Sequence, residues 1–568
     1  MRRLLWIPAI LILLVSSSFI ALVSMSSTSG RPKQSKALST PGATTQGIHT
    51  ITVTPWGPDQ TTIDETKTRI LTDPTLLRYL DGKNYRLLSF DFVESAVKQM
   101  PPVPPSRFKA TFFNYASNRS IAATGSFAGG AVTVSLPLEQ PTPSPEEFDA
   151  AVKILMKDPE LGDAISNGSL QPYPPMPPLL NIDQPADKVE RTLTVGLLPK
   201  DLSVQKNEIV GVNMIRETVS RYEGGAPQTS YASEVNCGVT SAGQSTTSNG
   251  TVGQFEVVIS RGTEEIWRFI CIRPSASSGN NRSGIELQNV RYRTKLVLAR
   301  ANAPILNVQY YRNACGPFRD WSWQEGMFVA NGTDVPGTNG GIRMCTDEPE
   351  TVLDNGTDTG NYRGVAVYDR EEVTLVSELN AGWYRYITKW IFHDDGMISP
   401  RFGFGATINS CVCNGHIHHV YWRFDFDVAT AANNAIEEFT QGVPKNIDTE
   451  SMRPRVSPDQ FWRVFNTMTG EAVLIKPGPL DGNYDKFGQG DLWLLRSHFP
   501  SEIDDSGQPA GNCSTCAHLN PMLTSESIAG QDVVVWYGGH WAHDHFDQNP
   551  MHSDGPQVNG PDLILQKY

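Results

Sequence analysis

Residues 414–419 (NGHIHH) and residues 532–543 (DVVVWYGGHWAH) carry most of the information about fold and function. Alternate side chains of an extended strand share a face, so His416 and His418 are predicted to point the same way. A third imidazole, from His543, would complete a three-histidine site. Neutral imidazoles suit copper or zinc and leave room for a water ligand. The two segments therefore predict a metal site built on strands.

The H-x-H spacing alone does not identify the metal or the class of protein. The same spacing occurs in zinc enzymes and in cupin barrels, and a surface histidine pair needs no metal. A cupin-like zinc or iron oxygenase would need a glutamate ligand shortly after His418 and fewer residues before His543. The sequence around the histidines is therefore needed to separate these classes.

Three segments resemble the copper amine oxidases, in the order that this family shows. Residues 384–396 (YRYITKWIFHDDG) are similar to N-Y-D-Y-x-x-x-W-x-F-x-x-D-G, and residues 416–438 to H-x-H followed by R-L-D-x-D-x-D-G-x-x-N-x-V-x-E. Residues 532–543 are similar to D-I-V-V-W-Y-x-x-G-x-x-H. Weaker similarity runs from about residue 284 to residue 565. One match would mean little, but an ordered set is specific.

The resemblance implies a cofactor, a reaction and the residues that serve them. His416, His418 and His543 would bind copper(II). Tyr384 falls on the tyrosine that copper and dioxygen convert to topaquinone, and Tyr310 on the tyrosine that hydrogen-bonds the quinone. Such a cofactor oxidises a primary amine to an aldehyde and releases ammonia and hydrogen peroxide, while the protein supplies the metal, the base and a dry geometry. The resemblance also implies a homodimer.

Two departures from the family's pattern concern catalysis. Trp383 and Arg385 stand where the family has Asn and an acidic residue beside the quinone precursor, although strand alternation predicts that both point away from the face of Tyr384. The segment with the aspartate base is missing after Tyr310, and Asp320 is the nearest substitute. The alternative to an oxidase is therefore a non-catalytic, metal-binding relative that serves extracellular binding or recognition.

A second cation site is implied at the far end of the same strands. Asp425, Asp427 and Asp532, with the carbonyl groups of Phe426 and Val533, match the family's peripheral site for a hard cation. A cluster of carboxylates suits calcium. The alternative is that these are ordinary aspartates at strand ends.

The eight cysteines favour disulfides in an exported protein. The resemblance pairs Cys315 with Cys345. A four-thiolate zinc site is the alternative for two further cysteine pairs. These pairs are Cys411 with Cys413 and Cys513 with Cys516.

Charge and the N-terminal sequence indicate a secreted or extracellular protein. The net charge of -13 argues against nucleic acid as a partner, because phosphate neutralisation needs a basic surface. Residues 1–27 combine Arg2 and Arg3 with an apolar run, which predicts a signal peptide or a membrane anchor. Glycosylation sequons fit this route. They begin at Asn118, Asn167, Asn249, Asn281, Asn331, Asn355 and Asn512.

The chain is predicted to be mainly β. A flexible linker at 28–61, rich in Ser, Thr, Gly and Pro, precedes two small α+β domains at 62–140 and 141–225. Helical spacing over residues 62–80, and a helix capped by Ser144 with Pro145 at its first position, supply the helices of these domains. Residues 226–568 alternate as strands. The resemblance makes this body an antiparallel β-sandwich preceded by two cystatin-like domains.

Overall fold

A computed structural model describes the chain from residue 48 to residue 568, with gaps. The predicted signal peptide or anchor at 1–27 lies outside the described residues. The described residues are 48–80, 84–94, 98, 100–175, 178–180, 185, 187–200, 208–221, 237–240, 252–279, 282–310, 318–319, 324–478, 481, 492–503, 519–543 and 558–568.

No helix within these residues combines the length and the apolar character that crossing a membrane requires.

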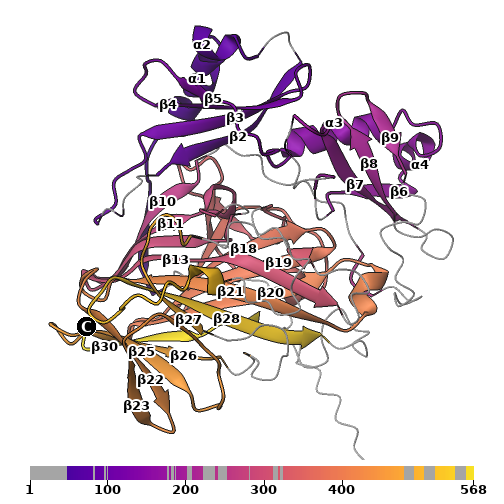
Figure 1. Ribbon diagram of the computed structural model, residues 1–568. Helices are drawn as coiled ribbons and strands as arrows, with labels where there is room; N and C mark the ends of the chain where they lie inside the picture. The colour runs from indigo at the N-terminus through magenta and orange to yellow at the C-terminus, as the bar shows by residue number, and fades with distance from the viewer. Residues whose placement is uncertain are drawn as a thin grey trace, which may run out of the picture. The chain divides into compact units, whose positions relative to one another are not determined.

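Two large sheets, paired almost entirely antiparallel, form the body of the protein (Figure 1). Ten described strands make the first sheet, in the order β1 (Thr50–Pro55), β10 (Gln254–Arg261), β11 (Glu264–Ile272), β12 (Glu286–Tyr292), β13 (Lys295–Tyr310), β21 (His416–Phe426), β28 (Val533–His543), β27 (Leu492–Arg496) and β24 (Ser451–Arg453), with β14 (Phe318–Arg319) beside β13. Twelve described strands make the second, in the order β15 (Gly332–Asp334), β16 (Ile342–Cys345), β17 (Val365–Asp369), β18 (Val373–Ala381), β19 (Tyr384–Phe392), β20 (Met397–Ala406), β30 (Asp562–Gln566), β26 (Ala472–Lys476), β25 (Phe461–Asn466), β22 (Asn434–Thr440) and β23 (Val443–Ile447), with β29 (Val558–Asn559) beside β20.

Two four-stranded sheets, each with its own helices, precede this body. The first unit contains α1 (Gln60–Ile70), α2 (Pro74–Leu77), β2 (Tyr85–Val93), β3 (Arg107–Asn114), β4 (Arg119–Ser126) and β5 (Thr133–Ser135). The second contains α3 (Pro145–Leu155), α4 (Gly162–Ser166), β6 (Leu170–Tyr173), β7 (Thr192–Pro199), β8 (Glu208–Asn213) and β9 (Thr218–Ser220). Helix α3 begins as predicted, because the Ser144 side chain accepts a hydrogen bond from the Glu147 backbone N–H at 3.1 Å. The predicted fold class is therefore confirmed.

One predicted boundary differs in the structure. Residues 50–55, which fall inside the predicted linker 28–61, form β1 and pair with β10 from Thr50↔Ser260 to Pro55↔Phe255. The reason is local alternation, since Ile51 and Val53 pack against the core while the residues between them are exposed. The first large sheet thus begins before the first small unit.

The core of the sandwich lies between the two large sheets and is rich in aromatic side chains. Trp390 of β19 and Trp422 of β21 meet there edge to face, with ring centroids 5.3 Å apart, and both are fully buried. Because Trp390 and Trp422 belong to different sheets, this contact fixes β19 over β21. That packing brings the residues at the other ends of the same strands together.

Candidate functional site

Strand β21 directs His416 and His418 into the space between the sheets. Its alternate residues Val420, Trp422 and Phe424 belong to the core, and the two histidines continue that face with exposures of only 3% and 2%. The predicted common orientation of His416 and His418 is what this alternation produces, with ring centroids 4.8 Å apart.

Tyr384 reaches the same space from the second sheet. Its hydroxyl lies 2.9 Å from Nε2 of His416, and the side chain is 2% exposed. The other ring nitrogen of His416, Nδ1, is 2.5 Å from the backbone carbonyl oxygen of Asn414. A carbonyl oxygen only accepts, so Nδ1 carries the proton and Nε2 keeps its lone pair. The Tyr384 hydroxyl therefore donates to the nitrogen that could bind a metal.

A second tyrosine, Tyr386, approaches His418. Its hydroxyl lies 3.3 Å from Nδ1 of His418, and the His418 ring stacks on Phe404 with centroids 3.6 Å apart. The ring of Tyr384 meets His418 edge to face at 4.8 Å. Tyr386 was not predicted as a site residue, although its position two residues after Tyr384 places it on the same face of β19. Period-two alternation was the signal that could have found it.

Backbone register relates the remaining predicted residues to His416. The strand pairing sets His543 of β28 directly opposite His416, and Tyr310 of β13 opposite it on the other side. This backbone register is compatible with the predicted three-histidine site. The side chains of Tyr310 and His543, and the whole of Asp320, lie outside the described part of the structure.

The two residues that flank Tyr384 are placed differently from each other. The Arg385 guanidinium makes two hydrogen bonds to the buried carboxylate of Asp358, at 2.7 and 3.0 Å, and one to Oδ1 of Asn380 at 2.6 Å. It is therefore held on the opposite face from Tyr384. Trp383 precedes the strand in a turn, where alternation does not apply, and its ring centroid is 6.3 Å from that of Tyr384.

The three carboxylates predicted as calcium ligands surround the ammonium group of Lys98. The ammonium group of Lys98 donates to Asp425 Oδ1 at 2.7 Å, to Asp427 Oδ1 at 2.6 Å and to the two oxygens of Asp532 at 2.8 and 2.9 Å. Burial raises the pKa of the Asp427 carboxyl to about 7 and that of Asp532 to about 6, although Lys98 opposes both shifts. Phe426 and Val533 are opposite each other in the register of β21 and β28.

The predicted Cys315–Cys345 disulfide is wrong, because Cys345 is a free cysteine. Burial raises the pKa of its thiol to about 12. Cys413 is bonded to Cys237, and Cys411 is also disulfide-bonded. The four-thiolate zinc alternative is therefore excluded for Cys413 and Cys411, and the Cys237–Cys413 bond instead anchors the segment that leads into His416.

A second buried histidine pair lies on the opposite face of β21. His419 and His540 face each other in the register, each is 1% exposed, and their Nδ1 atoms are in hydrogen-bond contact. Only one of the two nitrogens can donate in such a contact, so the other His accepts through its lone pair. Both residues are buried on the face of the first sheet that carries Tyr421.

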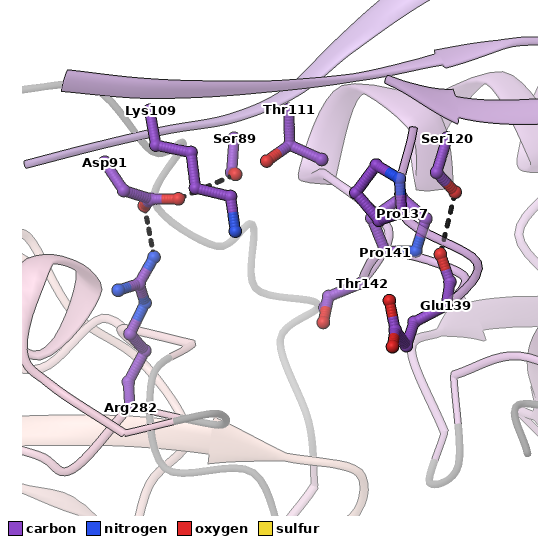
Figure 2. Close-up of a pocket in the computed structure, with 10 residues that line it drawn as sticks. All are labelled: Ser89, Asp91, Lys109, Thr111, Ser120, Pro137, Glu139, Pro141, Thr142 and Arg282. Atoms are coloured by element: carbon purple, nitrogen blue, oxygen red, sulfur yellow. Dashed lines mark hydrogen bonds and ion pairs between the residues drawn. The ribbon is translucent and has the colours of Figure 1, made fainter. Parts of the chain in front are cut away.

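A surface pocket of about 240 Å³ is lined by residues of the first small unit and by Arg282 of the large body (Figure 2). Figure 2 shows Arg282 reaching Asp91, which also accepts a hydrogen bond from Ser89 at 2.8 Å. Its other lining residues are Lys109, Thr111, Ser120, Pro137, Glu139, Pro141 and Thr142. The pocket contains the Arg282–Asp91 ion pair but none of the candidate histidines or tyrosines, so it is not the candidate site.

Comparison with known proteins identifies solved structures that share this fold. No protein-family model and no curated protein matches the sequence. Among solved structures, the copper-containing benzylamine oxidase from Hansenula polymorpha is 11% identical with a TM-score of 0.54, covering 90% of this chain and 97% of that one. The Aspergillus nidulans amine oxidase is 14% identical with a TM-score of 0.53, covering 90% of this chain and 88% of that one. The chain has the fold of the copper amine oxidases over about 90% of its length.

Proposed function

We propose that this protein is a copper-dependent oxidase of primary amines that uses a quinone made from its own Tyr384. One observation carries the proposal, namely the 2.9 Å contact between the Tyr384 hydroxyl and Nε2 of His416 in a buried site shared with His418. A self-processing tyrosine must lie beside the metal ligands, and this arrangement satisfies that requirement in a chain with the amine oxidase fold.

The donor set fits copper. The carbonyl of Asn414 fixes the His416 tautomer with the lone pair on Nε2, where a metal would replace the hydrogen bond from Tyr384, as the outer partners of metal-binding histidines commonly do. Tyr386 can accept a hydrogen bond from Nδ1 of His418, which would leave Nε2 of His418 available in the same way. His543 would supply the third ligand. Copper(II), when bound to these nitrogens, would supply the redox chemistry with dioxygen that oxidises the neighbouring ring.

The protein's own residues position the Tyr384 ring and exclude water from it. Tyr384, His416 and His418 are all at most 3% exposed, so bulk water is excluded from the oxidisable ring. Phe404 packs edge to face against Tyr384, with centroids 5.9 Å apart, and restrains the ring. Arg385 is bound by Asp358 on the other side of the strand and leaves this space to the phenol.

A metal-binding relative without turnover is the second candidate, and a feature of the sequence favours it. The segment that carries the family's aspartate base is missing between Tyr310 and Cys315. Loss of a positioned general base lowers a rate by roughly a hundredfold to ten-thousandfold. Such a protein would bind copper and could still modify Tyr384 without oxidising amines at a useful rate. Secretion remains part of both proposals and is supported by the Cys237–Cys413 disulfide.

Amine turnover after copper loading tests the proposal. Protein stripped of metal by a chelator is loaded with copper(II) in air, and hydrogen peroxide release is followed with benzylamine and with short aliphatic amines. We expect amine-dependent peroxide that is lost in Tyr384→Phe and in His418→Ala. Tyr384→Phe removes one oxygen from a buried ring, so it serves as a matched control that keeps the packing.

The same preparations separate the two candidates. Copper retention with a quinone but no peroxide would favour the non-catalytic relative. Peroxide release that persists in Tyr384→Phe would contradict the proposed role of this tyrosine.

A further inference from the structure

Lys98 occupies the centre of the three-carboxylate cluster formed by Asp425, Asp427 and Asp532. An ammonium group has three N–H donors, and each of the three carboxylates accepts from Nζ within 2.6–2.9 Å. Asp425 and Asp427 are 1% and 0% exposed, and the Lys98 side chain is 17% exposed. The contact is therefore a largely buried ion cluster in which all three N–H donors of Lys98 can be used, and not a surface ion pair.

The ammonium group and a metal ion exclude each other at this position. Calcium needs six to eight oxygen ligands at roughly 2.3–2.6 Å, and four of the six carboxylate oxygens here already contact Nζ. An ion bound to the same oxygens would overlap the ammonium group and be repelled by its charge. Arg423 adds a further positive charge, 3.3 Å from Asp425 Oδ2.

Other contacts hold Lys98 close to the cluster. Lys98 lies between β2 and β3, and the preceding Glu94 accepts hydrogen bonds from Arg300 at 2.6 Å and from Gln288 at 3.2 Å. Asp91, near the C-terminal end of β2, forms an ion pair with Arg282 (Figure 2). Because Lys98 is part of the chain, its ammonium group stays near the three carboxylates and competes with free calcium for the same oxygens.

We propose that Lys98 is a built-in counter-cation, which fills the three-carboxylate site in place of a divalent metal ion and fastens the β2–β3 segment to strands β21 and β28. The chain then needs no calcium at this position. The site would accept calcium once the lysine is removed, because the three carboxylates would remain with no central cation.

This inference does not depend on the proposed oxidase function. Asp425 is nine residues from His416 along β21, which corresponds to roughly 30 Å at about 3.3 Å per residue. Copper content should therefore stay the same in Lys98 variants.

Calcium titration of the full-length protein tests the inference. After treatment with a chelator, the unmodified protein should show no stoichiometric heat on addition of calcium chloride, and its Tm should not change. Lys98→Met keeps an unbranched side chain of similar shape but removes the ammonium group and its charge. We expect Lys98→Met to bind one calcium ion per chain and to regain with calcium the Tm that the substitution loses.

Three controls make the outcome decisive. Lys98→Met with Asp427→Asn should lose the acquired calcium binding, and Lys157→Met, which changes an exposed lysine, should acquire none. Stoichiometric calcium binding by the unmodified protein, abolished by Asp427→Asn, would overturn the proposal, and so would a folded Lys98→Met that binds no calcium. If Lys98→Met does not fold, the titration of the unmodified protein still decides whether the site takes calcium.

Discussion

At the scale of single residues, two tyrosines of one sheet each meet one histidine of the other. Tyr384 contacts His416 at 2.9 Å and Tyr386 contacts His418 at 3.3 Å. Alternation within each strand could be predicted from the sequence, because it needs only the period of two. The pairing of hydroxyl with imidazole could not, because it depends on how β19 packs over β21.

The Tyr386 hydroxyl is expected to tune the metal affinity of His418. Removing an outer hydrogen-bond partner of a ligating histidine typically lowers metal affinity by about 10-fold to 100-fold. Tyr386→Phe should therefore weaken copper binding by that factor, measured by competition with a chelator of known affinity, while leaving the fold intact by circular dichroism. Copper affinity equal to that of the unmodified protein would show that the 3.3 Å contact does not act on the ligand.

Glu378 is a buried carboxyl whose ionisation opposes folding. Burial raises its pKa to about 8 from 4.5, and its Oε1 has no hydrogen-bond partner among the described atoms. Because the folded protein holds this proton more tightly than the unfolded chain, the contribution of Glu378 to stability falls as pH rises from about 4.5 to about 8.

Glu378→Gln should remove this pH dependence. Above about pH 8 the free energy of unfolding of the variant should exceed that of the unmodified protein by roughly 2 to 5 kcal/mol. Near pH 4.5 the two proteins should differ little in stability. Urea unfolding across this pH range is the measurement. Equal slopes of stability against pH in the two proteins would contradict the assignment.

At the scale of elements, strand β21 carries a candidate site on each of its two faces. His416 and His418 face the core between the sheets, whereas Asp425 lies on the other face with Tyr421 and shares its ion cluster with Lys98. A slip of one residue in the pairing of β21 would exchange these faces and destroy both sites. Its register with β13 and β28 is therefore the feature on which the site depends.

The Cys237–Cys413 disulfide should support the start of β21. It closes a loop of 176 residues in sequence and ends three residues before His416. Replacing both cysteines with serine should lower the free energy of unfolding by roughly 2 to 5 kcal/mol and weaken copper binding, because the segment before His416 loses its anchor. Equilibrium unfolding and the chelator competition measure the two effects.

Cys345→Ser offers the control for this pair, since Cys345 is a half-buried free thiol in the same body. It should leave copper binding unchanged. A double variant as stable as the unmodified protein would show that the disulfide does not hold the segment.

The cysteines and Lys98 show which contacts could not be predicted from the sequence. The mainly β body and the helix capped by Ser144 followed from local patterns, and the structure contains both. The Cys315–Cys345 pair came from resemblance and is wrong, because disulfide partners are set by the fold and Cys345 is free. Lys98 was missed since 327 residues separate it from Asp425 and nothing in its neighbourhood marks a partner.

At the scale of the whole molecule, the fold is retained where the sequence has almost entirely changed. Identities of 11% and 14% accompany coverage of 90% of the chain in two amine oxidase structures. Burial patterns and strand register preserve such a fold, because many apolar sequences of suitable volume can fill the same core. Activity depends on far fewer residues than the fold does, and Tyr384 is the first of these to test.

The mass of the peptide that contains Tyr384 tests the central claim most directly. Metal-free protein is loaded with copper(II) in the presence or absence of dioxygen and then digested for mass spectrometry. With dioxygen, the peptide should gain the mass of two oxygen atoms and lose that of two hydrogen atoms, as conversion of tyrosine to topaquinone requires. Without dioxygen, and in His418→Ala, it should stay unmodified. An unmodified Tyr384 in copper-loaded, aerated protein would contradict the account.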